Sequence, residues 1–361
     1  MHSFGETGVV MADDPTSTLP PSTLARFPDA RGYLNTASLG LPTDDTLDAI
    51  RTHLDDWAAG RCEPPAFDAF VDRSRTAYGR LVRVDASAVA VHAQVSVITG
   101  LVAASLPDRA RVLCAEEDFT SVLYPFLVDQ RLAVRTVPLE QLLDSITPDT
   151  DLVAVSAAQS ADGRRIDLDE LAEAASDAGA RTYVDLTQAA GWTVIDAGRF
   201  DVTACGAYKW LCCPRGAALM TVDEAATDWL VPRAANWYAG AERWGASIYG
   251  PGMELPDDAW RYDTSPAWIA WVGSAPALEL LADIGPAVVE AHDVGLANAL
   301  RSGLGLDPSD SAIVSLAVDG GPEALTSAGI RCAGRAGKVR LSFHLYNTVD
   351  DVDSALEVLG S

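Results

Sequence analysis

Three polar residues within residues 183–220 have the types and the spacing that could do chemistry. Asp185 ends an apolar run that predicts a strand, Gln188 comes shortly after it, and Lys209 follows the next such run. A lysine amine can form a Schiff base with pyridoxal 5′-phosphate (PLP), and a carboxylate beside the ring nitrogen keeps that nitrogen protonated. A single aspartate at a strand end is commonly a cap or turn residue and a single lysine is commonly a surface residue, so the spacing alone leaves both interpretations open.

The common catalytic signatures are absent from the sequence. It contains no GxGxxG dinucleotide motif, no phosphate-binding P-loop and no GxSxG nucleophile elbow. The five histidines, at positions 2, 53, 92, 292 and 344, do not have the spacing of metal ligands. The sequence therefore predicts no metal site, and it disfavours Ser-His-Asp catalysis.

Short apolar runs alternate with helical patterns between residues 85 and 225, which predicts an α/β fold with a mostly parallel sheet. The uncharged stretch 86–106 contains His92 and other polar residues, so we expect a buried strand and helix there rather than a membrane span. Ligands bind at the carboxyl ends of parallel strands, which places Asp185 and the segment after Cys205 at the functional edge. The other expected strands are 112–115, 133–137, 152–156, 181–185, 202–205 and 217–222, and 167–178 is an expected helix.

Two lobes are expected, because 361 residues exceed the usual size of one domain. Residues 232–266 are rich in Trp, Tyr, Gly and Pro, which indicates a long functional loop. We predict a flexible N-terminal arm at 1–30, a large PLP-binding domain at 43–255, and a small α/β domain formed by 31–42 and 256–361. The elements expected outside the large sheet are helices at 43–59, 267–283, 286–304 and 349–359 and strands at 312–317 and 339–343.

The composition argues against several classes of partner. A formal net charge of −25 repels the phosphates of nucleic acids and anionic membranes. The first residues lack the basic start and apolar stretch of a signal peptide. The six cysteines form no CxxC motif, and the adjacent pair at 212 and 213 is too close for ordinary disulfide geometry. We therefore expect a cytoplasmic protein with reduced thiols that binds neither nucleic acid nor membrane.

Several segments resemble one known family. VDLTQAAGW (184–192) and DVTACGAYKWLCCPRG (201–216) are similar to the cofactor signature of the class V aminotransferases, which include cysteine desulfurases and isopenicillin-N-epimerase-like proteins. The resemblance implies fold-type I of the PLP-dependent transferases, as in aspartate aminotransferase. That fold has a mostly parallel sheet in the large domain and a smaller α/β C-terminal domain. Further similar segments, in the family's order, are YLNTASLGLP (33–42), EEDFTSVLYPF (116–126), VSAAQSADGRRIDLDEL (155–171), RYDTSPAW (261–268) and VRLSFHLYNTVDDVD (339–353).

The resemblance assigns roles around the cofactor ring. Lys209 would form the Schiff base and move the Cα proton, and Asp185 would pair with the ring nitrogen. Gln188 would hydrogen-bond the ring hydroxyl, and Phe119 would stack on the ring.

The resemblance also implies a phosphate site at a helix start, formed by Val95 and Ser96 with help from Tyr208. The family usually has two small hydroxyl or glycine residues where this chain has Val95 and Ser96, and it often has serine where this chain has Gly206. Ser265 aligns with a hydroxyl residue that reaches the phosphate of a partner subunit, which implies a homodimer with shared active sites.

An amino acid substrate is expected, and Arg340 would bind its carboxylate because a guanidinium can grip a carboxylate with two hydrogen bonds. Asn35 and Gln159 are further candidates for contacts near the substrate and the ring hydroxyl. Aromatic residues of the long loop and the helix after it could line the pocket, although such residues more commonly pack in a core: Trp237, Tyr238, Trp244 and Trp268.

The reaction is expected to be transamination, with other outcomes left open. A cysteine desulfurase needs a cysteine on a long mobile loop, and only nine residues separate Ile330 from Arg340, with Cys332 near the start. A C–S lyase or an amino-acid epimerase needs no such cysteine. A binding protein without chemistry is the remaining alternative, and the joint presence of Lys209, Asp185, Gln188 and Arg340 argues against it.

Overall fold

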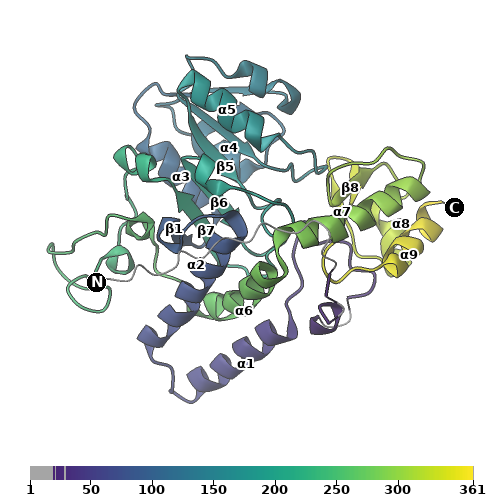
Figure 1. Cartoon of the computed structure of the whole chain (residues 1–361), viewed down its shortest axis with the longest axis horizontal. Coiled ribbons are helices and arrows are strands. Elements are labelled where there is room, and N and C mark those ends of the chain that lie inside the picture. The colour runs from purple at the N-terminus through teal and green to yellow at the C-terminus, as the bar shows by residue number, and fades with distance from the viewer. Residues whose placement is uncertain (1–18, 21, 28–29, 361) are drawn as a thin grey trace, which may run out of the picture.

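Two sheets of unequal size organise the protein in this computed structural model, which describes residues 19–20, 22–27 and 30–360 (Figure 1). The larger sheet has seven strands in the order β1-β7-β6-β5-β4-β2-β3, and the smaller has three in the order β8-β10-β9. The flexible arm predicted for residues 1–30 lies largely outside the described residues.

The large sheet is mostly parallel, as predicted, and β7 is the strand that runs against its neighbours β6 and β1. All residues of β4, β6 and β7 are buried, which is why these strands read as continuous apolar runs rather than as alternating patterns. The predicted strands are confirmed to within one residue at each end. Their bounds are β1 (Val89–His92), β2 (Arg111–Ala115), β3 (Ala133–Val137), β4 (Leu152–Ser156), β5 (Arg181–Asp185), β6 (Val202–Gly206) and β7 (Ala218–Val222).

Helices cover both faces of this sheet. Along β4, Leu152 and Ala154 pack into one core and Val153 and Val155 into the other, as the two-residue period of a strand requires. The first core includes residues of α3 (Val95–Ser105) and α4 (Thr120–Leu127). The second includes residues of α2 (Asp68–Val82), α5 (Leu168–Ala178) and α6 (Trp268–Ile284). The predicted helix at 167–178 is α5, whose first turn is capped by the Asp167 side chain.

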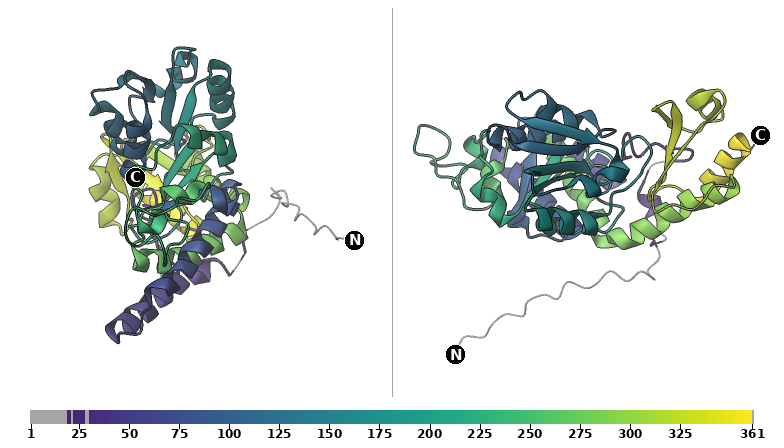
Figure 2. Two further views of the ribbon diagram at one scale, coloured as in Figure 1. Left: turned by 90° about the vertical axis from the view of Figure 1, so that its left-hand side faces the viewer. Right: turned by 90° about the horizontal axis from the view of Figure 1, so that it is seen from above.

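A smaller lobe follows α6 in the chain (Figure 2). Its antiparallel sheet packs against helices around a separate core that includes Val314, Leu341 and Val352, and Leu34 from the N-terminal segment joins this core. The predicted helices of this region are α7 (Pro286–Gly303) and α9 (Val349–Leu359), and the predicted strands are β8 (Ile313–Leu316) and β10 (Lys338–Ser342). The structure adds α8 (Gly321–Ser327) and β9 (Ala333–Arg335), which were not predicted from the sequence.

Helix α6 packs with the large lobe. Trp271 and Leu278 lie in the core beneath the large sheet, and α6 contacts both α2 and α1 (Asp44–Ala58). We therefore propose a lobe boundary at Gly285, which separates α6 from α7 with a φ of 87°, rather than near residue 255. Within the described residues no single helix is long and apolar enough to span a membrane, and only α6 and α7 together reach that length and hydropathy, with a bend of 85° between them.

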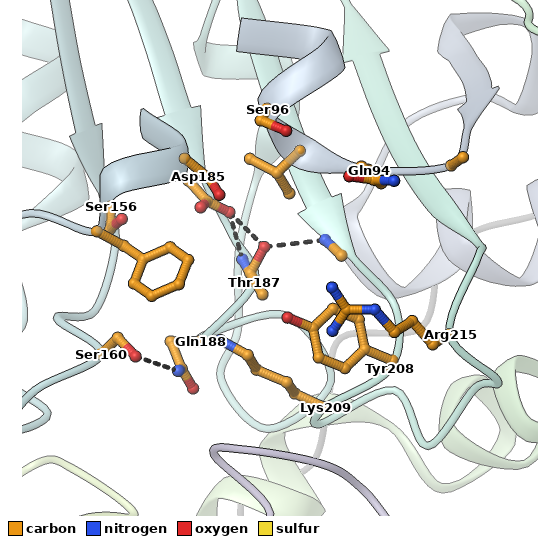
Figure 3. Close-up of a pocket in the computed structure, with 15 residues that line it drawn as sticks. Gln94, Ser96, Ser156, Ser160, Asp185, Thr187, Gln188, Tyr208, Lys209 and Arg215 are labelled. Atoms are coloured by element: carbon orange, nitrogen blue, oxygen red, sulfur yellow. Dashed lines mark hydrogen bonds between the residues drawn. The ribbon is translucent and has the colours of Figure 1, made fainter. Parts of the chain in front are cut away.

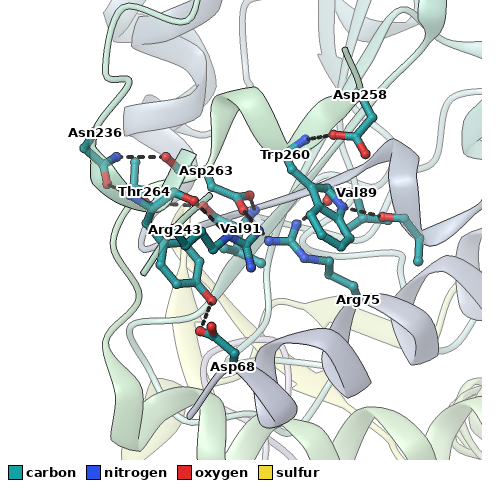
Figure 4. A network of polar contacts seen from close by, with 12 residues as sticks. Asp68, Arg75, Val89, Val91, Asn236, Arg243, Asp258, Trp260, Asp263 and Thr264 are labelled. Carbon is teal, nitrogen blue, oxygen red and sulfur yellow. Dashed lines mark hydrogen bonds and ion pairs between the residues drawn. The ribbon is translucent and has the colours of Figure 1, made fainter. Parts of the chain in front are cut away.

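The predicted loop at 232–266 contains only short 3-10 turns, and a buried ion-pair network ties it to the sheet (Figure 4). The carboxylate of Asp263 pairs with Arg75 of α2 and with Arg243 at 3.0 Å, and it accepts the Val91 N–H at 2.9 Å. The next residue, Thr264, donates its N–H to the Val91 carbonyl at 3.0 Å. Within the described residues the 3-10 helices are η1 (Leu24–Arg26), η2 (Pro64–Phe67), η3 (Ala86–Ala88), η4 (Leu139–Gln141), η5 (Leu143–Ser145), η6 (Ala197–Arg199), η7 (Glu224–Asp228), η8 (Trp237–Ala239) and η9 (Ala259–Tyr262).

Asp263→Asn is expected to lower the free energy of unfolding by about 3–5 kcal/mol, because it leaves the fully buried Arg75 charge without a carboxylate. Urea unfolding monitored by circular dichroism measures the loss. The matched control is Asp283→Asn, which breaks a pair with Arg80 whose side chains are 69% and 53% exposed, and it should cost less than about 1 kcal/mol. Equal losses in the two variants would show that the buried network does not anchor the loop.

Candidate active site

A cavity lies at the carboxyl ends of the central strands, beside the first turn of α3 (Figure 3). It brings together seven of the residues that the sequence predicts as a site: Val95, Ser96, Phe119, Asp185, Gln188, Tyr208 and Lys209. The remaining lining residues are Ala93, Gln94, Ser121, Ser156, Ser160, Thr187, Gly206 and Arg215.

Lys209 lies in the turn that follows β6, and the N-terminal segment holds this turn in place. The Gly40 N–H donates to the Tyr208 carbonyl at 2.9 Å, and a Cβ on Gly40 would lie 2.0 Å from the Lys209 carbonyl oxygen. Only glycine therefore allows this close approach. The segment around Gly40 fixes the backbone that presents the amine to the cavity.

The amine of Lys209 is poised to be a nucleophile. The residue is 6% exposed, and its Nζ lies 5.4 Å from the centroid of the Phe119 ring. Burial lowers the pKa of Lys209 to about 8; the Asp185 carboxylate opposes this shift, and the positive charge of Arg340 adds to it. A larger share of the amine is thus neutral near pH 7 than for a lysine in water, and the neutral amine is the form that attacks a carbonyl.

Asp185 is the last residue of β5, and only one of its two carboxylate oxygens accepts hydrogen bonds from the described residues. Its Oδ1 accepts hydrogen bonds from the N–H of Thr187 at 2.8 Å and from the Thr187 hydroxyl, and that hydroxyl accepts the Gly206 N–H at 2.9 Å. Within the described residues Oδ2 accepts no hydrogen bond. Burial raises the pKa of Asp185 to about 6, although the Thr187 hydrogen bonds lower it. The free oxygen could accept a hydrogen bond from a protonated ring nitrogen, which would favour the ionised carboxylate.

The amide of Gln188 has a fixed orientation. Trp210 donates its indole N–H to Oε1 at 2.8 Å, and Nε2 donates to the Ala37 carbonyl at 3.0 Å and to the Ser160 hydroxyl at 2.9 Å. Both N–H donors of the amide are used in this arrangement, so Gln188 could donate to an oxygen on a bound ring by releasing the Ser160 hydroxyl in the cavity wall. Trp210 and Ser160 were not predicted as site residues, because nothing in their spacing along the sequence indicates that they contact Gln188.

Phe119 is held by its neighbour Asp118. The Asp118 carboxylate accepts the N–H of Phe119 and the N–H of Ser156, each at 2.7 Å, and also the Ser156 hydroxyl at 2.5 Å. The Phe119 side chain is 45% exposed and borders the cavity, so it is not packed in a core. Its free ring face is suited to stacking on a planar ligand.

The first turn of α3 forms another wall of the cavity. The helix begins at Val95, and the Gln94 side chain does not cap it. The first N–H groups of a helix have no acceptor within the helix, so Val95 and Ser96 present donors that suit an anion.

Arg340 lies just behind the wall, on β10. It is 1% exposed, it donates to the carbonyl and hydroxyl of Ser160, and its Nη2 donates to the Ser38 hydroxyl at 2.7 Å. No carboxylate among the described residues pairs with it. Burial lowers the pKa of Arg340 to about 10, so the guanidinium remains charged at neutral pH. A buried cation without a counter-charge is suited to an anionic substrate group.

Some predicted residues lie elsewhere. Asn35 pairs with Ser342 beside β10 and its buried Oδ1 has no hydrogen-bond partner, whereas Gln159 is buried next to the cavity wall; neither lines the cavity. Ser265 is exposed and does not line the cavity of its own chain. The four aromatic residues do not line it either. Trp237 packs against Tyr238 and Trp244, and Trp268 stacks on Phe67 with 5.0 Å between ring centroids.

Comparison with known proteins identifies the family. The family model described as "Aminotransferase class-V" matches residues 124–315, which is just over half of the chain. The chain belongs to the aminotransferase class-V family. A curated relative, the "Uncharacterized aminotransferase YcbU" of Bacillus subtilis (strain 168), is 27% identical over 313 residues, covering 80% of this chain and 82% of the relative.

Solved structures share the fold of this class V chain. A cysteine desulfurase from Thermococcus onnurineus NA1 superposes with a TM-score of 0.81 at 18% identity, covering 95% of this chain and 98% of its own. The cystine C-S lyase C-DES, in complex with cysteine persulfide, also has a TM-score of 0.81, at 17% identity over 92% of this chain and 98% of its own. A lysine-to-alanine mutant of C-DES carries glycine covalently linked to PLP. The predicted fold-type I architecture and the predicted cofactor are confirmed: this class V member is a PLP-dependent enzyme.

The cavity suits PLP by its own chemistry. It offers an amine with a lowered pKa, a carboxylate oxygen without a hydrogen bond, an exposed aromatic face and the free N–H donors of a helix start. These match, in turn, the aldehyde, the ring nitrogen, the ring face and the phosphate of the cofactor.

Proposed function

We propose that this class V enzyme is an amino-acid aminotransferase whose Lys209 carries the cofactor. Asp185 pairs with the ring nitrogen, Gln188 with the ring oxygen, and Phe119 stacks on the ring. Ser96, Val95 and Tyr208 surround the phosphate. The observation that carries the proposal is that the buried Lys209 amine and the free Asp185 oxygen line one cavity, with the unpaired Arg340 cation directly behind its wall.

Each residue has a defined task in the proposed reaction. PLP supplies an electron sink that stabilises negative charge at the substrate Cα once a proton has left it. Lys209 would hold the cofactor, and its amine would also act as the general base and acid that takes and returns the Cα proton. Asp185 would keep the ring nitrogen protonated, and Thr187 fixes the position of its carboxylate. Asp118 holds Phe119 against the ring as a positioning residue.

Arg340 is proposed to bind the substrate carboxylate. Its guanidinium donates hydrogen bonds to Ser38 and Ser160. The Ser160 hydroxyl also accepts a hydrogen bond from Gln188 at the cavity wall. A substrate carboxylate would replace these neutral acceptors by a charged one, which makes stronger hydrogen bonds. Asn35 and Gln159 could then contact the substrate only if side chains rearrange, because neither lines the cavity.

The hairpin between β9 and β10 supports a reaction without a sulfur-carrying cysteine. Arg335 pairs with Lys338, so only Ala336 and Gly337 form the turn, with φ of 46° and 75°. This is the geometry of a two-residue type I′ hairpin, which leaves no long loop. Cys332, before this hairpin, packs against the core of the small lobe, and burial raises the pKa of its thiol. A thiol in that state is a poor nucleophile.

The proton-transfer groups in the cavity favour transamination over epimerisation. Transamination can use one amine that takes the proton from Cα and returns it to the cofactor, whereas epimerisation needs a proton donor on each face of Cα. Lys209 is the one amine among the described residues that line the cavity, and the Tyr208 hydroxyl, which could also donate a proton, is assigned to the phosphate. A C–S lyase would use the same amine and stays the alternative.

A homodimer in the cytoplasm completes the proposal. Ser265 is exposed next to the anchored Thr264, which suits a residue that reaches the phosphate site of a partner subunit. All six cysteines have free thiols, four of them buried, which is usual for a protein of a reducing compartment.

A panel of L-amino acids added to the PLP-loaded enzyme, without a 2-oxo acid, tests the reaction. A transaminase converts its cofactor to the pyridoxamine form with release of one 2-oxo acid per active site, and added 2-oxo acid then restores the original absorbance. Continuous release of sulfide or pyruvate would reject transamination in favour of a lyase. Loss of optical activity without product would reject it in favour of an epimerase.

Cys332→Ala is expected to leave kcat/KM of the best substrate within about twofold of wild type, because the thiol is packed away from the cavity. The measurement is steady-state kinetics, together with mass spectrometry for persulfide on the wild-type protein. Cys62→Ala, at another half-buried thiol, is the matched control. Loss of activity in Cys332→Ala alone, with persulfide trapped on Cys332, would establish the desulfurase reaction.

A further inference from the structure

The predicted residues of the phosphate site supply hydrogen-bond donors but no positively charged side chain. A phosphate monoester carries close to two negative charges at neutral pH. The helix start offers N–H donors, Ser96 offers one hydroxyl, and Val95 and Gly206 offer none. The chain as a whole carries a net charge of −25, which opposes anion binding. A local cation other than Lys209 would therefore strengthen phosphate binding at the proposed site.

Arg215 is a cation that borders the same cavity. It lines the cavity together with Ser96, Gln94 and Tyr208, and Figure 3 shows its guanidinium beside the Tyr208 ring. Within the described residues Arg215 donates no hydrogen bond and forms no ion pair, although the chain has 51 acidic residues against 26 basic ones. Its guanidinium carbon lies 4.8 Å from the centroid of the Tyr208 ring, so the ring supports it without using its N–H donors.

Gly206 makes room for this arrangement. A Cβ on Gly206 would lie 3.3 Å from Cε1 of Tyr208 and 3.5 Å from the Thr187 side chain, so a larger residue would press on the ring. At position 206 the family often has serine. Glycine at this position lacks the serine hydroxyl but leaves room beside it. That space is taken by the ring on which Arg215 stacks.

The backbone at Arg215 is also held in place. The Ala207 N–H donates to the Ala217 carbonyl and the Cys213 N–H donates to the Ala207 carbonyl, both at 3.1 Å. These bonds close the loop that runs from Lys209 to Arg215. The lysine and the arginine thus belong to one hydrogen-bonded loop at the cavity edge.

We propose that Arg215, stacked on Tyr208 in the space left by Gly206, binds the cofactor phosphate in place of the missing hydroxyl groups. This inference rests on the proposed position of the phosphate at the start of α3. A guanidinium can give two parallel N–H donors to a phosphate, whereas the serine hydroxyl it replaces gives one.

Binding of PLP and of pyridoxal, which lacks the phosphate, tests the inference. Cofactor-free protein is titrated with each compound, and the covalent complex is followed by absorbance. Arg215→Gln is expected to raise the Kd for PLP by about 10- to 100-fold and to change the Kd for pyridoxal by less than about twofold. The control is Arg199→Gln, at an arginine that pairs with Asp169 outside the cavity, and it should change neither Kd.

The outcomes separate this inference from the proposed function. If wild-type protein forms a covalent complex with neither compound, the assignment of Lys209 itself fails. If wild type binds both and Arg215→Gln binds PLP as tightly as wild type, Arg215 does not contact the phosphate. Equal weakening for PLP and pyridoxal would likewise overturn the inference, because a group that acts on the ring or on Lys209 cannot distinguish the two. Size-exclusion chromatography measures the oligomeric state of Arg215→Gln. If the variant loses PLP affinity only because its subunits separate, Arg215 acts in subunit contact and the inference is overturned.

Discussion

Lys209→Ala is expected to abolish the absorbance of covalently bound cofactor and to reduce kcat/KM by about 10⁴-fold or more, while the protein still folds. The variant loses both the amine that holds the cofactor and the general base that moves the Cα proton. The substitution removes an amine whose pKa is lowered by burial. The hydrogen bond from the Thr187 N–H to Asp185 remains in place. Absorbance spectra and steady-state kinetics, with circular dichroism as the folding check, measure these effects.

The chain offers an unusually direct control for this experiment. It contains two lysines, Lys209 and Lys338, and Lys338 is exposed on the β9–β10 hairpin. Lys338→Ala should keep both the spectrum and the activity of wild type. A Lys209→Ala protein that retains the wild-type spectrum would reject the assignment.

Asp185→Asn is expected to lower kcat by on the order of 10²–10³-fold while PLP stays attached to Lys209. An amide cannot hold a proton on the ring nitrogen as a carboxylate does, so the ring becomes a weaker electron sink. The amide oxygen can still accept the hydrogen bonds of Thr187, so the fold at the end of β5 should survive. The ratio of bound PLP to protein and the single-turnover rate with the best amino acid separate retention from chemistry.

Asp201→Asn is the matched control for that variant. Asp201 accepts hydrogen bonds from the N–H and hydroxyl of Thr182, each at 2.9 Å, at the opposite end of β5. Its loss should weaken the fold and leave the single-turnover rate unchanged. A similar loss of rate in both variants would show that Asp185 acts through the stability of β5 rather than through the ring nitrogen.

The architecture was largely predictable from sequence because most strands of the large sheet are buried on both faces. Each of these appears as a short apolar run with clear ends, and the predicted bounds of β4 and β5 coincide with those of the structure. The predicted bounds of β3 coincide as well, although this edge strand is largely exposed. The lobe boundary was harder to place. Helix α6 follows the long loop in sequence, as a small-lobe element would, but its apolar residues pack beneath the large sheet.

The central residues of the site were also predictable, because strand ends converge on one edge of the sheet and the family resemblance gives an order to them. The supporting residues were not. They form hydrogen bonds between residues far apart in the sequence, and no local pattern marks such pairs. The separations are 22 residues for Trp210 and Gln188, 38 for Ser156 and Asp118, and 188 for Arg75 and Asp263. Arg215 lies in the segment 201–216 that resembles the family signature, but no role was predicted for it from the sequence. Its contact with Tyr208 depends on the turn between the two residues.

Borohydride reduction of the purified PLP-loaded protein, followed by peptide mass spectrometry, tests the central claim most directly. Reduction converts a Schiff base to a stable amine, so the modified residue can be read from its peptide. We expect one pyridoxyl phosphate group per chain, on the peptide that contains Lys209. A label on Lys338 or on the N-terminal amine, or no label at all on an active preparation, would contradict it.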